Sequence, residues 1–248
     1  MHAMSWLTAR PVAHRGLHDA KAGIIENTTS AFAAAIAANY AFECDLQITA
    51  DGEAVVHHDH QLGRLTEGAS RLAEMTTTEL KRVRYKASAD RILTVGELCD
   101  LVAGRVTMLI ELKSRFDGDT RVVQRAAQVL AGYSGPAALM SFDPTQIACL
   151  RATAPQLTRG VVAESRYLPS DWPGLPEQSR RMMLYFRHAL RTRPHFIAYS
   201  VKDLPAVVPF AARNVFRRPV LTWTVRTQAD REKAARWADQ MIFEGFRP

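Results

Sequence analysis

The feature that most constrains the fold is an alternation of short apolar, β-branched runs with longer amphipathic segments, which extends from one end of the 248-residue sequence to the other with one interruption. The expected strands are residues 10–14, 40–49, 106–113, 137–142, 157–164, 195–201, 219–225 and 240–245. The expected helices include residues 28–40, 95–104, 119–132, 143–153, 178–190, 203–215 and 227–239. Eight strands alternating with about seven or eight helices are typical of a (β/α)8 barrel.

An open, doubly wound parallel sheet is the alternative fold, but no G-x-G-x-x-G motif follows the first expected strand. Residues 60–93 interrupt the alternation and are too long for a simple loop. The sequence therefore predicts an α/β, TIM-like barrel with a small insertion after the second strand. It also predicts one domain that spans residues 1–248.

The charge and the cysteines limit the class of protein. A net charge of +7 permits nucleic-acid binding, but the chain shows no arginine-rich tail, zinc-finger spacing or RNA-binding signature. The surplus is either incidental or a field that attracts small anionic substrates. No apolar run reaches bilayer-spanning length, and residues 1–16 lack the apolar centre of a secretory signal. The cysteines at 44, 99 and 149 are odd in number and widely spaced, which indicates a reducing compartment and not a disulfide framework. We therefore expect a cytoplasmic protein, and the short apolar runs predict that it has no membrane span.

Carboxylates are expected at the ends of two strands. Side chains alternate along a strand, so Glu43 and Asp45 share the inner face while Cys44 points toward the helices. Glu111 and Lys113 share a face in the same way. Active sites of barrels lie at the C-terminal ends of the strands. Three carboxylates there predict one hard divalent cation, Mg²⁺ or Ca²⁺, with an internal network of ion pairs as the alternative.

The stretch 54-AVVHHDHQLGRLT-66 raises the question of which histidine is functional. Asp51 and Gly52 predict a hairpin turn, and a two- or four-residue loop would pair residues whose numbers add to 103. In that register His58 faces Asp45, whereas His57 points away. A three-residue loop would reverse the parity, and a histidine-rich turn can also be plain polar surface. The pattern favours His58.

The first strand ends in 14-HRG-16. His14 is expected to point inward, the guanidinium of Arg15 suits phosphate oxygens, and Gly16 lets the backbone approach a ligand closely. The motif is weak evidence in isolation, because an ordinary surface turn would look the same.

Together these residues resemble the glycerophosphodiester phosphodiesterase family. The matching segments keep the family's order and spacing over nearly the whole chain: 14-HRG-16, 26-ENTTSAF-32, 43-ECDLQITADGEAVVHHD-59, 64-RLT-66, 110-IELK-113, 141-SF-142 and 222-TWTV-225. The resemblance implies a TIM-like barrel with an insertion after the second strand. It also implies hydrolysis of a small glycerophosphodiester to glycerol 3-phosphate and an alcohol.

The resemblance further implies a role for each site residue. His14 and His58 would be the acid/base pair, and the metal ligands would be Glu43, Asp45 and Glu111. Arg15 would hold the phosphate, supported by Glu26 and Lys113. Trp223 would line the glycerol pocket, although a tryptophan on a barrel strand is more often part of the core. The histidine of the family's His-Asp pair corresponds to His58, since Asp59 follows it.

The chain departs from the family at Ile25, at Gly63 and in 242-IFEGFRP-248, where the family usually shows proline, aspartate and an Ile-Ile-Thr-Asp-like end. None of these departures removes a catalytic or metal position. A rival activity is lysophospholipase D-like cleavage of lysophospholipids, which needs an apolar groove built from residues 68–86 and 164–176. A rival from another class is a non-catalytic phosphate- or nucleic-acid-binding barrel, but two histidines beside a metal site argue against it. We therefore expect no nucleic-acid partner, and the sequence predicts no oligomeric state.

Overall fold

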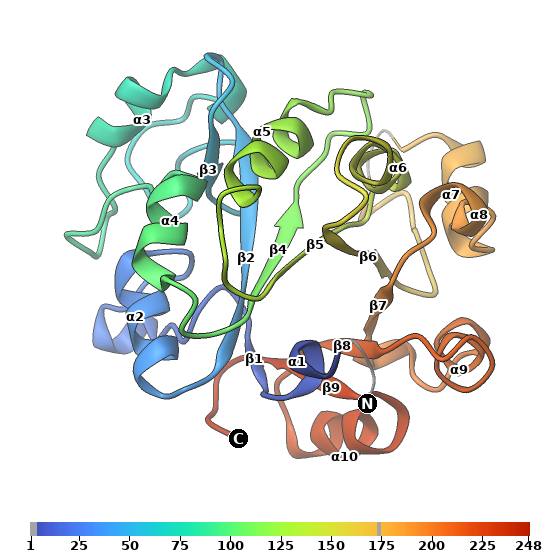
Figure 1. The fold of residues 1–248 in the computed structure, drawn as a ribbon. Helices are drawn as coiled ribbons and strands as arrows, with labels where there is room; N and C mark the ends of the chain where they lie inside the picture. The colour runs from blue at the N-terminus through green and yellow to red at the C-terminus, as the bar shows by residue number, and fades with distance from the viewer. Residues whose placement is uncertain (1–3, 173–174) are drawn as a thin grey trace.

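The computed structural model describes residues 4–172 and 175–248. Its strands form a closed ring at the centre of the molecule (Figure 1). Eight parallel strands form the ring: β1 (Val12–Ala13), β2 (Ala41–Ile48), β4 (Met108–Leu112), β5 (Ala137–Ser141), β6 (Thr158–Ala163), β7 (Phe196–Ser200), β8 (Val220–Val225) and β9 (Gln240–Phe243). Neighbouring strands follow one another around the ring, and β1 closes it by pairing with both β2 and β9. The predicted TIM-like barrel is confirmed.

Helices surround the ring (Figure 1). They are α2 (Thr29–Ala37), α4 (Val95–Val102), α5 (Arg121–Leu130), α6 (Pro144–Thr153), α7 (Glu177–Leu184), α8 (Ala189–Thr192), α9 (Val207–Asn214) and α10 (Gln228–Trp237). The shorter elements are α1 (Ser5–Thr8), η1 (Ala20–Ala22), η2 (Leu72–Glu74), α3 (Thr77–Arg82) and η3 (Val201–Asp203). No helix in the described part of the chain is long and apolar enough to cross a membrane.

The helix expected at residues 178–190 is two helices in the structure. Between α7 and α8, Phe186 adopts a φ of +51°, in the left-handed region where a non-glycine residue interrupts an α-helix. The helix expected at 203–215 begins four residues later, at Val207, because η3 and the Leu204–Pro205 segment come first.

Alternation along the strands produces two apolar layers. Outward side chains such as Phe42 and Ile110 pack against the surrounding helices. Inward side chains such as Leu109 and Phe196 fill the barrel, where Leu7 of α1 joins them. The interior is therefore solid core, and the polar groups of a site can gather only at the C-terminal ends of the strands.

The insertion at residues 60–93 has a small apolar cluster of its own. Leu72, Leu80 and Tyr85 are each at most 5% exposed and pack with Ile25 and Val55. These side chains attach the insertion to the barrel. They do not line an apolar groove of the kind the lysophospholipid rival requires.

The hairpin register predicted from the sequence is wrong. The strand β3 (Ala54–Val56) runs antiparallel to β2, with Leu46 opposite Val56 and Ile48 opposite Ala54. The loop at 50–52 therefore has three residues, and it ends on Gly52 with a φ of +82°, as three-residue hairpin loops prefer. This register places the backbone of His57, not His58, opposite Asp45.

Candidate active site

Three carboxylates meet at the C-terminal ends of β2 and β4. One oxygen from each of Glu43, Asp45 and Glu111 lies within 4.8 Å of the other two. Glu43 and Asp45 share the inner face of β2, and Asp45 is the direct register partner of Glu111 on β4. All three are buried. The structure therefore brings together the residues that the sequence analysis predicted as metal ligands.

Two cationic side chains and one amide surround these carboxylates. Lys113 Nζ lies 2.8 Å from Asp45 Oδ1 and 2.7 Å from Glu111 Oε1. The backbone N–H of Arg15 donates to Glu43 Oε2 at 3.0 Å, and its Nε lies 3.4 Å from Asp45 Oδ2. Asn27 Nδ2 donates to Asp45 Oδ2 at 2.8 Å. Glu43 Oε1 is buried and has no hydrogen-bond partner among the described residues.

The ionisation of the cluster reflects an excess of negative charge. Burial, reinforced by the charges of Asp45 and Glu111, raises the pKa of Glu43 well above its ordinary value. Burial also raises the pKa of Glu111, against the opposing charge of Lys113. The pKa of Asp45 is lowered although burial opposes this, because the charges of Lys113, His58 and Arg15 together outweigh the effect of burial. The two cations thus keep Asp45 ionised, whereas burial favours the neutral forms of Glu43 and Glu111.

His14 follows β1 and is oriented by a carboxylate from the opposite end of the chain. Its Nδ1 donates to Glu244 Oε2 at 2.8 Å, and its Nε2 lies 4.0 Å from Glu43 Oε2. Glu244 follows β9, the ring neighbour of β1, and also accepts from Arg226 at 2.9 Å. The hydrogen bond from His14 lowers the pKa of Glu244 to about 2. Since the carboxylate only accepts, Nδ1 carries hydrogen and Nε2 faces the cluster.

His58 has the same kind of support. Its Nδ1 donates to Asp59 Oδ1 at 2.8 Å, and Arg64 Nε donates to the other oxygen of that carboxylate at 2.6 Å. Burial, together with the charges of Lys113 and Arg15, lowers the pKa of His58 to about 4 despite the charge of Asp45. Both candidate histidines therefore have Nδ1 on a carboxylate that is itself held by an arginine.

His57 occupies a different environment from its neighbour. Its side chain is 3% exposed, and Nδ1 donates to the backbone oxygen of Asp59 at 2.9 Å. His58, by contrast, lines a cavity that it shares with Glu111 and Lys113. Because β3 ends at Val56, the bend that follows the strand brings His58 to the carboxylate side. His58, the histidine favoured from the sequence, therefore lies on the carboxylate side although the predicted register is wrong.

A chain of ion pairs connects the loop after β1 to His58. Glu26 accepts from Arg15 Nη1 at 2.8 Å and from Arg64 Nη2 at 2.7 Å. Arg64 continues the chain to Asp59, the partner of His58. Arg15 and Glu26, both predicted to serve the substrate, thus bind each other here and stiffen the loop beside the carboxylates.

The loop after β1 depends on glycine at position 16. Gly16 has a φ of +82°, and a Cβ atom there would lie 2.9 Å from the backbone carbonyl carbon of Ala31 in α2. A side chain would push this loop away from α2 and move His14 and Arg15 with it.

The cavity beside the cluster has a volume of about 740 Å³, within the range of small-molecule sites. One wall is polar and carries His58, Glu111 and Lys113. The other is apolar and includes Phe116, Phe142, Trp172 and Leu175. A ligand with a small polar group and an attached organic group would fit this cavity, with the polar group at the polar wall and the organic group at the apolar wall.

Trp223 on β8 is the one predicted site residue that the structure does not bring to the cluster. Its ring packs edge-on against Phe142, with the ring centroids 5.4 Å apart, and its Nε1 donates to Ala198 O at 3.1 Å. Phe142 lines the cavity, so Trp223 lies one ring behind that wall.

Four residues that support the site have no role in the prediction from the sequence: Asn27, Asp59, Arg64 and Glu244. Asn27, Asp59 and Arg64 lie inside the segments quoted for the family resemblance, so the signal for them was present. Glu244 directly follows the last strand, and the rule that strand ends build the site would have found it. It was instead treated as part of a departure from the family pattern.

Comparisons with known proteins agree with this geometry. Residues 14–246 match the model of the glycerophosphoryl diester phosphodiesterase family. A glycerophosphodiester phosphodiesterase of Caldanaerobacter subterraneus subsp. tengcongensis is 25% identical over 232 residues, which cover 90% of this chain and 88% of that protein.

Two solved structures share the fold. One is a phosphodiesterase of Oleispira antarctica in complex with the product sn-glycerol-3-phosphate; its TM-score is 0.76 at 19% identity, over 96% of this chain and 94% of that chain. The other is a glycerophosphodiester phosphodiesterase of Thermotoga maritima, with a TM-score of 0.70 at 22% identity over 94% of both chains. At these identities the similarity to the two solved structures shows a shared barrel fold.

Proposed function

The chain belongs to the glycerophosphoryl diester phosphodiesterase family, and from this premise we propose that it hydrolyses glycerophosphodiesters with one divalent cation and a pair of histidines. The observation that carries the proposal is the buried convergence of Glu43, Asp45 and Glu111 beside two carboxylate-held imidazoles. Burial of three carboxylates with only two cationic partners is costly unless a further positive charge joins them.

The residues present fit a hard divalent cation. The donors are oxygens only, which Mg²⁺ and Ca²⁺ prefer over softer metals. Glu43 Oε1 is buried without a partner in the described part of the chain and is thus available as a ligand. We infer that Glu43, Asp45 and Glu111 hold the ion. Once bound, a divalent cation of this kind supplies charge neutralisation to a phosphodiester.

We assign the proton transfers to His14 and His58. The carboxylate on each Nδ1 fixes the tautomer and leaves Nε2 to exchange a proton with the substrate. One imidazole takes a proton from the attacking hydroxyl, and the other donates a proton to the departing alcohol. The attacker is water or the glycerol hydroxyl of the substrate itself, which would give a cyclic phosphate first.

The remaining predicted residues are assigned to binding. Arg15 and Lys113 place positive charge where the phosphate would lie, and Glu26 holds the Arg15 guanidinium in place. We place the glycerol phosphate at the polar wall of the cavity and the alcohol group at the aromatic wall. Trp223 would act through Phe142, which it supports. The product bound by the Oleispira antarctica phosphodiesterase, sn-glycerol-3-phosphate, is the product we expect here.

The test is release of glycerol 3-phosphate from glycerophosphocholine, with and without a chelator. We expect release that a chelator abolishes and that added Mg²⁺ or Ca²⁺ restores. Glu111→Gln should raise the concentration of metal needed for half-maximal rate. Release that is unchanged by the chelator would refute the metal site, and no release with either ion would refute the activity.

Lysophospholipase D-like cleavage is the second candidate, and one observation favours it. Trp172 and Leu175, from the segment 164–176, do contribute an apolar wall to the cavity. Parallel rates on glycerophosphocholine and lysophosphatidylcholine decide between the two, because only the second substrate gains from an apolar wall. Solvent ¹⁸O in the product would identify direct attack by water.

A further inference from the structure

The positive charge of this chain is concentrated in one stretch. Residues 176–218 contain nine Lys and Arg residues but only two acidic ones, an excess of seven that equals the excess of the entire sequence. This stretch includes α7, α8 and α9, which lie on the same flank of the ring (Figure 1). Phe186, between α7 and α8, and Val208 of α9 pack against the same apolar cluster.

Several of these arginines gather at one end of the barrel. Residues 190–193 and 215–218 directly precede β7 and β8, which are parallel neighbours, so both segments lie at the N-terminal edge. The candidate active site lies at the opposite, C-terminal edge. We call these two segments, together with Arg151, the arginine edge.

Hydrogen bonds to the backbone hold Arg151 against the segment 190–193. Arg151 Nη1 donates to the backbone oxygens of Leu190 and Arg191, at 3.2 and 2.8 Å. Beneath them, burial and the charges of Arg151 and Arg218 lower the pKa of the Arg159 side chain. Like charges are therefore packed tightly enough to repel one another.

The exposed arginines of this edge have no acidic partner in the part of the chain that the structure describes. Among residues 4–172 and 175–248, no carboxylate lies within 4.0 Å of Arg191, Arg193, Arg217 or Arg218. Asp239, which precedes the neighbouring strand β9, is an acidic residue on the same edge, but it is paired with Arg213 at 2.8 Å. An anionic partner would relieve the repulsion that the protein leaves uncompensated.

Apolar side chains project between these arginines. Leu190 is 86% exposed, Val215 66% and Phe216 68%. Of the eight large hydrophobic side chains exposed in the described part of the chain, seven lie between residues 184 and 216. Single exposed apolar residues are ordinary, but basic and apolar side chains interleaved on one surface are typical of proteins that bind at a lipid interface.

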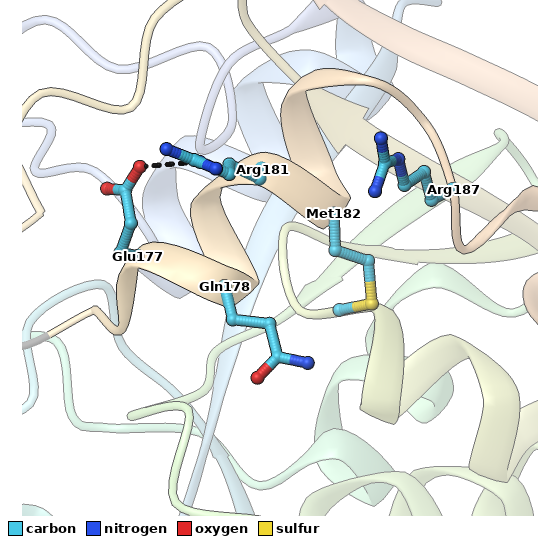
Figure 2. Close-up of a pocket in the computed structure, with 5 residues that line it drawn as sticks. All are labelled: Glu177, Gln178, Arg181, Met182 and Arg187. Atoms are coloured by element: carbon cyan, nitrogen blue, oxygen red, sulfur yellow. Dashed lines mark hydrogen bonds and ion pairs between the residues drawn. The ribbon is translucent and has the colours of Figure 1, made fainter.

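The basic surface continues along α7. Figure 2 shows a hollow on this helix, in which the Met182 side chain lies near Arg187 while Arg181 pairs with Glu177 at 2.9 Å. The hollow measures about 620 Å³. Arg187 has no carboxylate within 4.0 Å among the described residues, so this flank adds a further unpaired cation.

We propose that the arginine edge docks on the surface of a bilayer that contains anionic phospholipids. Leu190, Val215 and Phe216 enter the boundary between head groups and acyl chains, and the arginines bind the lipid phosphates. The mouth of the active site then faces the aqueous side. A second copy of this chain would bring a like-charged surface, and nucleic acid would leave three apolar side chains without a partner.

The test uses the full-length protein and sedimentation with vesicles of phosphatidylcholine alone or with about 30% phosphatidylglycerol. We expect binding only to the anionic vesicles, weakened as NaCl rises from about 0.05 M to about 0.5 M. One variant pair is Arg191→Gln with Arg218→Gln; Arg193 and Arg217 are left in place because both have a positive φ. The other pair is Leu190→Gln with Phe216→Gln.

The arginine pair should lower the partition constant by about 25-fold, because each of its two basic residues contributes roughly fivefold near an anionic surface. The apolar pair should lower it by at least about tenfold, because two large apolar side chains no longer enter the lipid interface. The matched control is Arg82→Gln with Arg84→Gln, two exposed arginines of the insertion without ion pairs among the described residues, and it should bind as wild type does. Circular dichroism verifies that all three variants are folded.

Five outcomes overturn the proposal. The first is absence of binding to anionic vesicles at low salt. The second is an equal loss of binding in the control pair and in the Arg191 and Arg218 pair. The third is full binding by the folded Leu190 and Phe216 variant. The fourth is a DNA duplex that binds more tightly than the vesicles and is insensitive to the apolar pair, which would make the edge a nucleic-acid surface. Dimerisation without lipid that the apolar pair abolishes would likewise assign the edge to a second copy. Phosphodiesterase rates on a water-soluble substrate are measured separately, so the proposed activity and the docking can fail independently.

Discussion

At the scale of single residues, each candidate histidine has the same neighbours: a carboxylate on Nδ1 and an arginine on that carboxylate. For His14 these are Glu244 and Arg226; for His58 they are Asp59 and Arg64. The arrangement recurs although the two sets come from different parts of the chain. It fixes which ring nitrogen faces the carboxylate cluster, which a proton-transferring imidazole requires.

Replacement of adjacent histidines should give opposite results. His58→Gln should lower kcat by about 10²–10⁴-fold, because it removes one acid–base group. His57→Gln should keep most of the activity but lower the free energy of unfolding, since its buried ring donates to the backbone of Asp59. Steady-state rates and thermal unfolding of both proteins check this. Equal loss of kcat in two folded variants would contradict the assignment.

Glu244 should act as a positioning residue for His14. Glu244→Gln should lower kcat by about 10–100-fold, the usual loss when the partner of a functional histidine is removed. Burial lowers the pKa of His14, and the hydrogen bond and charge of Glu244 oppose this. Loss of the charge should therefore lower the pKa of His14 further and move one limb of the kcat/KM pH profile to lower pH. Glu244→Asp should restore part of the rate. A pH profile that keeps its wild-type limbs would show that Glu244 is only structural.

Residue-level prediction from the sequence succeeded where strand alternation decides the outcome. Side chains alternate along a strand with a period of two residues, which predicts that Glu43, Asp45 and Glu111 point inward. The three carboxylates do converge in the structure. The register of the hairpin did not follow, because Asp51 and Gly52 fit loops of two, three or four residues. Nor can alternation place His58, whose position depends on a bend after the strand has ended.

At the scale of elements, the site is built from the ends of strands and from the loops that follow them. The loop after β1 carries His14 and Arg15, and it lies against α2 at Gly16. Strand and helix positions were largely predictable, since apolar periodicity reflects burial. The break between α7 and α8 was not, because Phe186 adopts a left-handed conformation that its residue type does not favour.

A pair of glycine variants can separate backbone strain from steric crowding in this loop. Gly16 and Gly52 share a φ of +82°, but a Cβ at Gly52 would meet nothing within 4 Å. Gly52→Ala should therefore cost only about 1 kcal/mol, for the left-handed backbone. Gly16→Ala should cost more and also lower kcat, because it displaces the loop after β1. Denaturant titrations and rates measure both effects, and similar stability losses would rule out the crowding against Ala31.

At the scale of the whole molecule, stability should depend on pH through a histidine outside the site. Burial lowers the pKa of His188 to about 4, whereas an unfolded histidine titrates near 6.5. The folded state then binds fewer protons than the unfolded state, so this contribution is complete above pH 6.5 and is lost as pH falls toward 4. Between pH 7 and 5 the loss is about 2 kcal/mol.

His188→Gln should remove that part of the pH dependence. Urea titrations of both proteins at several pH values give the two curves, and the variant's should be flatter by about 2 kcal/mol between pH 7 and 5. The comparison depends on slopes, so a constant difference in stability does not affect it. Parallel curves would mean that His188 is not held neutral by burial.

The closure of the ring by β1 has a consequence for how activity arises. This strand has two residues, yet it joins β2 to β9, the final strand in sequence. Glu244, just beyond that final strand, orients His14 at the start of the chain. A ribosome-bound or half-refolded chain can contain every metal ligand and both imidazoles and still lack this contact. Turnover should therefore be among the last properties to return after denaturation, later than helical circular dichroism, and would report that the two ends of the polypeptide have met.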